Sequence, residues 1–73
     1  MRKIDIHTEY IELDRLLKLA GIVSSGAEAK HLIQSGEIWV NGSSCTVVRK
    51  KIRPEDRVDV PDIGTLTVNI CES

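Results

Sequence analysis

The apolar positions of residues 13–20 follow the spacing of a helix. They fall at i, i+3, i+4 and i+7 and are occupied by Leu13, Leu16, Leu17 and Ala20. The polar residues between them, including Arg15 and Lys18, fall on the opposite face. Gly21 follows the last apolar position, where glycine adopts at little cost the left-handed conformation that ends many helices. The pattern predicts a short amphipathic helix that ends before Gly21.

A second helix is predicted to begin at Ser25. The sequence Ser25-Gly26-Ala27-Glu28 matches a capping box, in which the serine hydroxyl accepts from the N–H three residues on and the glutamate reaches back. Ala29, Leu32 and Ile33 then share one face, and Ser35-Gly36 marks the end of the helix.

Short segments with the pattern of strands follow the second helix. Residues 37–40 are rich in β-prone side chains and lead into Asn41-Gly42, the dipeptide best suited to a type I′ hairpin turn. We therefore expect residues 43–48 to form the return strand. Residues 57–60 and 65–70 alternate with a period of two, and the isoleucines at 4 and 6 suggest a further strand near the N-terminus.

This order of elements predicts one small α+β domain spanning residues 1–73, with two short helices packed on a mostly antiparallel sheet. The predicted core residues are Leu13, Leu16, Leu17, Ala29, Leu32, Ile33, Val40, Val58 and Val68. Adjacent strand residues face opposite sides, so Trp39 should point away from Ile38 and Val40 and be partly exposed.

Charge is balanced in total but unevenly distributed. The net charge is −1, yet four cations lie within residues 49–53, and residues 54–73 carry a net charge of −4. A short basic run is either a solvated turn or a local patch for a polyanion. Charge alone leaves both interpretations open.

Composition argues against several classes of protein. Tyr10 and Trp39 are the only aromatic residues, too few for a sheet that stacks single-stranded bases. Cys45 and Cys71 form no CxxC pair, and His7 and His31 lack the partners of a catalytic site, so we expect reduced thiols, no metal, no cofactor and no enzymatic activity. No apolar run approaches the ~20 residues of a membrane span, which favours a cytoplasmic protein.

A spaced series of short motifs resembles the S4 RNA-binding domain, the family named after ribosomal small-subunit protein four. The motifs are Leu13-Asp14-Arg15-Leu16-Leu17, Ala20-Gly21, Ser24-Ser25-Gly26-Ala27-Glu28-Ala29-Lys30, Leu32-Ile33, Gly36, Val40-Asn41-Gly42 and Pro54-Glu55-Asp56. The resemblance covers about residues 12–60 and is strongest to the short stand-alone bacterial members, the YaaA/YbcJ-like proteins.

This resemblance implies an αL-like RNA-binding module in which the helix faces and the hairpin region hold structured RNA. The residues that match the family's basic positions are Arg15, Lys18, Lys30, Arg49, Lys50 and Lys51. Independently of the resemblance, the backbone N–H groups at the start of the second helix, around Ser25, Gly26 and Ala27, are either a phosphate site or an ordinary helix start satisfied by its own capping box. Glu12, Gly26 and Ala27 stand where family members often carry basic residues.

Three functions are compatible with these patterns. The first is a non-enzymatic protein that binds ribosomal or transfer RNA by its backbone, with the ribosome or its assembly factors as further partners. The second, favoured by the neutral net charge, is a degenerate module that docks on a protein. The third, helix-turn-helix DNA binding, is weakest, because the second helix offers only Lys30 where several base-reading side chains are needed.

Overall fold

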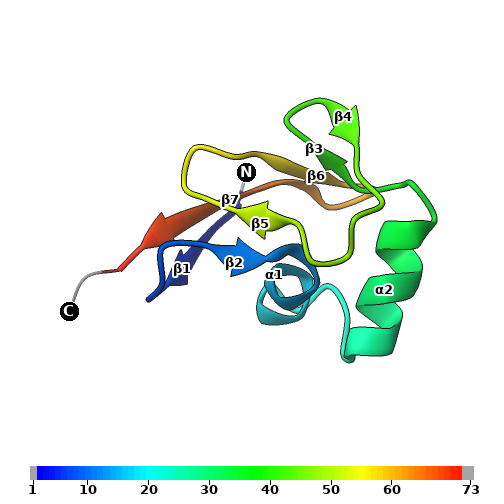
Figure 1. The fold of residues 1–73 in the computed structure, drawn as a ribbon, viewed down its shortest axis with the longest axis horizontal. Helices are drawn as coiled ribbons and strands as arrows, with labels where there is room; N and C mark the ends of the chain where they lie inside the picture. The colour runs from blue at the N-terminus through cyan, green and yellow to red at the C-terminus, as the bar shows by residue number, and fades with distance from the viewer. Residues whose placement is uncertain (1, 72–73) are drawn as a thin grey trace.

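Two helices lie on one side of a five-stranded sheet in a computed structural model that describes residues 2–71 (Figure 1). The elements are β1 (Arg2–Ile6), β2 (Ile11–Glu12), α1 (Leu13–Leu19), α2 (Gly26–Gln34), β3 (Trp39–Val40), β4 (Ser43–Ser44), β5 (Lys51–Ile52), β6 (Val58–Val60) and β7 (Gly64–Ile70). This is the α+β architecture that the sequence predicts.

The five-stranded sheet is mixed and has the order β1-β7-β6-β3-β4. Three of its pairs are antiparallel, whereas β1 runs parallel to β7, from Arg2 opposite Leu66 to Ile6 opposite Ile70. The remaining strands, β2 and β5, form a separate antiparallel pair in front of this sheet in Figure 1. The mostly antiparallel sheet is confirmed, and the parallel pair adds the predicted N-terminal strand at one edge.

The helix boundaries follow the predicted caps, with one difference. Gly21 has a φ of 76°, the left-handed conformation expected after α1. The Ser25 hydroxyl accepts from the Glu28 N–H at 3.2 Å, as in a capping box. The Glu28 carboxylate, however, accepts from the N–H and the hydroxyl of Ser24, at 3.2 and 3.0 Å, and not from Ser25. Ser24 supplies both its N–H and its hydroxyl to this carboxylate, whereas the Ser25 hydroxyl is engaged as the acceptor for the Glu28 N–H.

The hairpin turn is confirmed, but its second strand is shorter than expected. Asn41 and Gly42 have φ angles of 52° and 84°, the two positive values of a type I′ turn. Strand β4 ends at Ser44, so the prediction of a strand over residues 43–48 is wrong beyond that residue. The Cys45 N–H still donates to the Ile38 carbonyl at 2.9 Å, but farther along the chain the carbonyls of Val48 and Lys50 accept hydrogen bonds from α1 instead of pairing with the hairpin.

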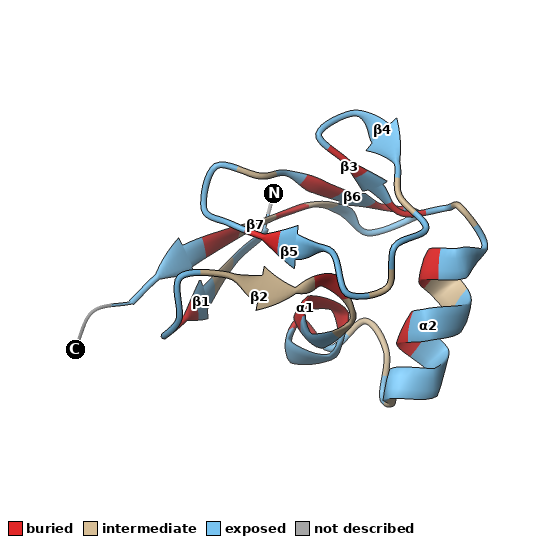
Figure 2. Cartoon of the chain, viewed as in Figure 1, coloured by how far each residue is buried: buried red, intermediate tan, exposed pale blue. Residues whose placement is uncertain are grey.

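A single cluster of apolar side chains joins the helices to the inner face of the sheet (Figure 2). All the predicted core residues belong to this cluster, although Leu32 is only partly buried at its margin. The cluster also contains residues that were not predicted as core: Ile38, Ile52 and Leu66, which are fully buried, and Ile6, which is 4% exposed. Trp39 is 46% exposed between buried neighbours, as its place on the hairpin predicts.

Candidate nucleic-acid interface

The basic segment after the hairpin is attached by its backbone to the start of α1. The Leu13 N–H donates to the Lys50 carbonyl at 2.9 Å, and the Asp14 N–H donates to the Val48 carbonyl at 3.1 Å. The first N–H groups of a helix have no acceptor within the helix, and the side chain of the N-cap residue Glu12 supplies none here. Residues 48–50 therefore cap α1, and this holds Arg49 at the beginning of that helix.

Arg49 and the start of α2 meet across a shallow hollow. Its lining combines three segments of the chain and consists of Asp14, Gly26, Lys30, Val48 and Arg49. Lys30 and Arg49 are both exposed. No atom lies within 4 Å of the place where a Cβ of Gly26 would stand, so the backbone there is open to a ligand. Ser25, half-buried beside it, caps the helix through the Glu28 N–H.

The other two predicted helix cations share the exposed face of α1. Arg15 and Lys18 are three residues apart, which places them on neighbouring turns of one face. Both are exposed, and they line a second hollow together with Ile11 and Leu19. This face is therefore cationic with an apolar floor.

Strands β2 and β5 place an aromatic ring among the cations of the basic segment. Ile11 pairs with the fully buried Ile52, so the residues on either side of each point outward. The Lys51 Nζ lies 5.0 Å from the centre of the Tyr10 ring, and the Arg53 guanidinium carbon lies 5.7 Å from it. Tyr10 and Arg53 were not among the predicted site residues, because only this pairing reveals their contact.

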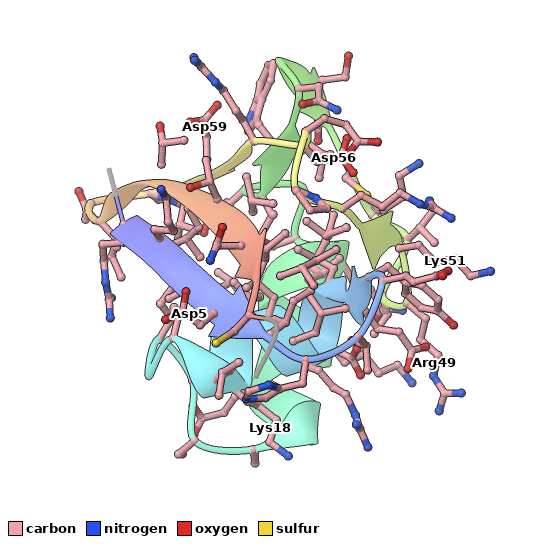
Figure 3. The ribbon with its side chains drawn as sticks, turned by 90° about the vertical axis from the view of Figure 1, so that its left-hand side faces the viewer. Asp5, Lys18, Arg49, Lys51, Asp56 and Asp59 are labelled. Atoms are coloured by element: carbon pink, nitrogen blue, oxygen red, sulfur yellow. The ribbon has the colours of Figure 1, made fainter. Side chains whose placement is uncertain are left out.

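Lys50 lies apart from the helix cations. It lines a hollow beside the hairpin, together with residues such as Asn41 and Thr46. In Figure 3, Arg49 and Lys51 lie on the right of the molecule and Lys18 at the bottom, whereas Asp5 and Asp59 lie on the left. The structure thus brings Lys30 and Arg49 together, and Arg15 and Lys18 together, while Lys50 extends the cationic side toward the hairpin.

Other kinds of site find little support in the part of the chain that the structure describes. Within residues 2–71, no group of three or more His, Cys, Asp or Glu side chains is arranged to hold a metal ion. Cys45 and Cys71 are free thiols. Among the same residues, no helix has the length and apolar character needed to cross a membrane.

The fold and this cationic side define a small α+β module in which two helices and a backbone-tied basic segment form one candidate interface. Residues 4–69 match the S4 domain family. The chain is also 34% identical over 65 residues to "Probable ribosome maturation protein RlbA" of Bacillus subtilis (strain 168). The aligned region covers 89% of this chain and 92% of that protein. The chain belongs to the S4 domain family, as its motifs indicate, and the match extends beyond the motifs into β1 and β7.

Proposed function

We propose that this protein is a non-enzymatic RNA-binding protein that holds structured ribosomal RNA during ribosome maturation. A single domain, residues 1–73, carries the activity, and it needs no cofactor. Membership of the S4 family supports RNA as the ligand, and the name of the Bacillus subtilis relative supports a role at the ribosome. Transfer RNA is the other structured RNA that the same surface would accept.

The observation that carries the proposal is the backbone attachment of residues 48–50 to α1. A basic turn that is free in solvent contributes only charge. This one is fixed so that Arg49 shares a hollow with Lys30 of α2. Cations held on rigid elements lose less conformational freedom when they contact phosphates, and this makes a defined binding surface out of a chain with a net charge of only −1.

Contacts to the RNA backbone are sufficient for this mode of binding. The deep major groove of duplex RNA is closed to side chains, so proteins hold it through phosphates, 2′-hydroxyls and shape. In the proposed complex Arg15, Lys18, Lys30, Arg49 and Lys51 contact phosphates, and Lys50 contacts the strand that passes the hairpin. The backbone at Ser25 and Gly26 donates to one phosphate at the start of α2.

The test is cross-linking in cells followed by sequencing of the attached RNA. We expect enrichment of ribosomal RNA by the wild type and loss of that enrichment in the double variant Lys30→Glu/Arg49→Glu. A matched control is Lys3→Glu/Arg57→Glu, which reverses two exposed cations that line a separate hollow. Enrichment of transfer RNA would replace ribosomal RNA by transfer RNA as the ligand in the proposal. Co-purification of a protein without RNA would overturn the proposal in favour of a docking module.

A further inference from the structure

An open hollow of about 500 Å³ lies beside the cationic face of α1 and has a different chemical character. Its lining includes Asp5, Tyr10, Ile11, Glu12, Arg15 and Leu19. We infer that this hollow accepts one unpaired base of the bound RNA, so that the preferred ligand is a duplex with a bulged nucleotide. The inference rests on the proposed function and extends it from the phosphates to a base.

The size and apolar walls of the hollow suit a single planar ring. Small-molecule sites typically have volumes of about 300–1,000 Å³, and this hollow falls within that range. Leu19 is 56% exposed, although it is a large apolar residue, and it lines the hollow together with Ile11 and the half-buried Tyr10. Two aromatic residues are too few for a platform that stacks several bases. A single base needs only one aromatic or apolar surface to pack against.

The charges inside the hollow select a base over a phosphate. The Glu12 carboxylate repels phosphate oxygens but accepts hydrogen bonds from the N–H groups on a base edge, whereas the Asp5 carboxylate already accepts a hydrogen bond from the Asn69 amide at 3.2 Å. Arg15 lines this hollow and also the neighbouring one, which contains Lys18. Lys51 stands over the Tyr10 ring at 5.0 Å. A nucleotide would therefore enter with its base at the Glu12 carboxylate and its phosphate among these cations.

The acceptor-only carboxylate of Glu12 also predicts which base is preferred. Guanine presents an imino and an amino N–H on the same edge, so it can donate two parallel hydrogen bonds to one carboxylate. Uracil presents a single N–H donor there. We therefore expect a bulged guanosine to bind more tightly than a bulged uridine.

The experiment compares two RNA hairpins that are identical except for one bulged guanosine. Stacking of one base changes affinity by about fivefold or more, so the wild type should bind the bulged hairpin about five- to tenfold more tightly than the continuous one. Leu19→Gln keeps the net charge and should abolish this preference, which is measured as the ratio of the two affinities, so that an equal effect of the substitution on both hairpins cancels. The matched control is Val47→Gln, because Val47 is also exposed, at 59%, but lines a different hollow.

Each outcome separates this inference from the proposed function. Equal affinity of the wild type for the two hairpins would overturn the base site and leave RNA binding intact. A preference that survives in Leu19→Gln would place the base elsewhere and would also overturn the assignment. Failure of the folded wild type to bind either hairpin would overturn the proposed function itself.

Discussion

Trp39 and Asp59 face each other directly across the antiparallel pair of β3 and β6. Ile38 and Val40, the neighbours of Trp39 in sequence, are buried beneath the sheet, so this pair lies on the face that the helices leave uncovered. Asp59 also accepts a hydrogen bond from the Thr65 hydroxyl at 2.6 Å. The lone tryptophan therefore reports on the side of the sheet away from the proposed RNA contacts.

We expect the fluorescence of Trp39 to stay unchanged when the protein is saturated with structured RNA. The indole is 46% exposed on the uncovered face, where its environment does not depend on phosphates bound at α1 and α2. The emission maximum and intensity should be measured during an RNA titration whose binding is followed independently. A shift of the emission at saturation would mean that the RNA reaches the sheet.

Salt should weaken binding steeply. Neutralising ~4 phosphates predicts a log–log slope of about −3, and thus a loss of affinity of tens-fold between 50 and 200 mM salt. The dissociation constant can be measured by anisotropy at four or more salt concentrations. A slope near zero would contradict an interface made of cations and phosphates.

Replacing Lys50 and Lys51 together with glutamate should weaken binding to all structured RNAs by a similar factor. The lost contacts are to the RNA backbone and carry no information about bases. The fold should persist, because the bond from Leu13 to residue 50 uses a carbonyl that the substitution retains. The lost contact of Lys51 with Tyr10 is worth about 0.5–1 kcal/mol at an exposed site.

The control for this variant is Lys3→Glu/Arg57→Glu, which makes the same change of charge at two cations of a separate hollow. Circular dichroism should show that both proteins are folded. Equal RNA affinity for the wild type and the Lys50/Lys51 variant at low salt would remove this segment from the interface.

Gly42→Ala should lower the free energy of unfolding by about 1–2 kcal/mol, the cost of a left-handed conformation for a residue with a side chain. Gly42 has a φ of 84°, and no neighbouring atom lies within 4 Å of an added Cβ, so the cost is one of backbone conformation alone. In a domain of this size each kcal/mol corresponds to about 4–8 °C in Tm.

The matched substitution is Gly26→Ala, at the first residue of α2, where the space is equally open and φ is not positive. It should leave Tm unchanged or raise it. The Tm of both variants is measured by thermal unfolding. An equal loss of Tm in the two variants would contradict the type I′ turn at Asn41 and Gly42.

Features that depend on neighbouring residues could be predicted from the sequence. The spacing of the leucines determines the buried face of α1, and the dipeptide Asn41-Gly42 sets its own turn. The parallel pairing of β1 with β7 could not be predicted, because it joins segments about 64 residues apart and no local pattern identifies a partner. The early end of β4 also depends on a contact between distant segments, because carbonyls beyond this strand accept hydrogen bonds from α1.

The residues of the candidate site also include some that the sequence could locate and some that it could not. Arg15, Lys18 and Lys30 could be located from helical periodicity, which shows that they occupy exposed positions. Tyr10 could not, because β2 and β5 contain two residues each and such short strands have no recognisable period. Its contact with the cations depends on the register of these two strands, which the sequence does not reveal.

The parallel neighbours β1 and β7 bear on how the chain folds as it is synthesised. Ile6 of β1 reaches its partner Ile70 only after almost the entire chain has been translated. Closing so long a loop is entropically costly and slows folding compared with the local helices and hairpin. The helices and the hairpin can therefore form first, whereas β1, an edge strand that pairs with β7, waits unpaired until that distant segment is available.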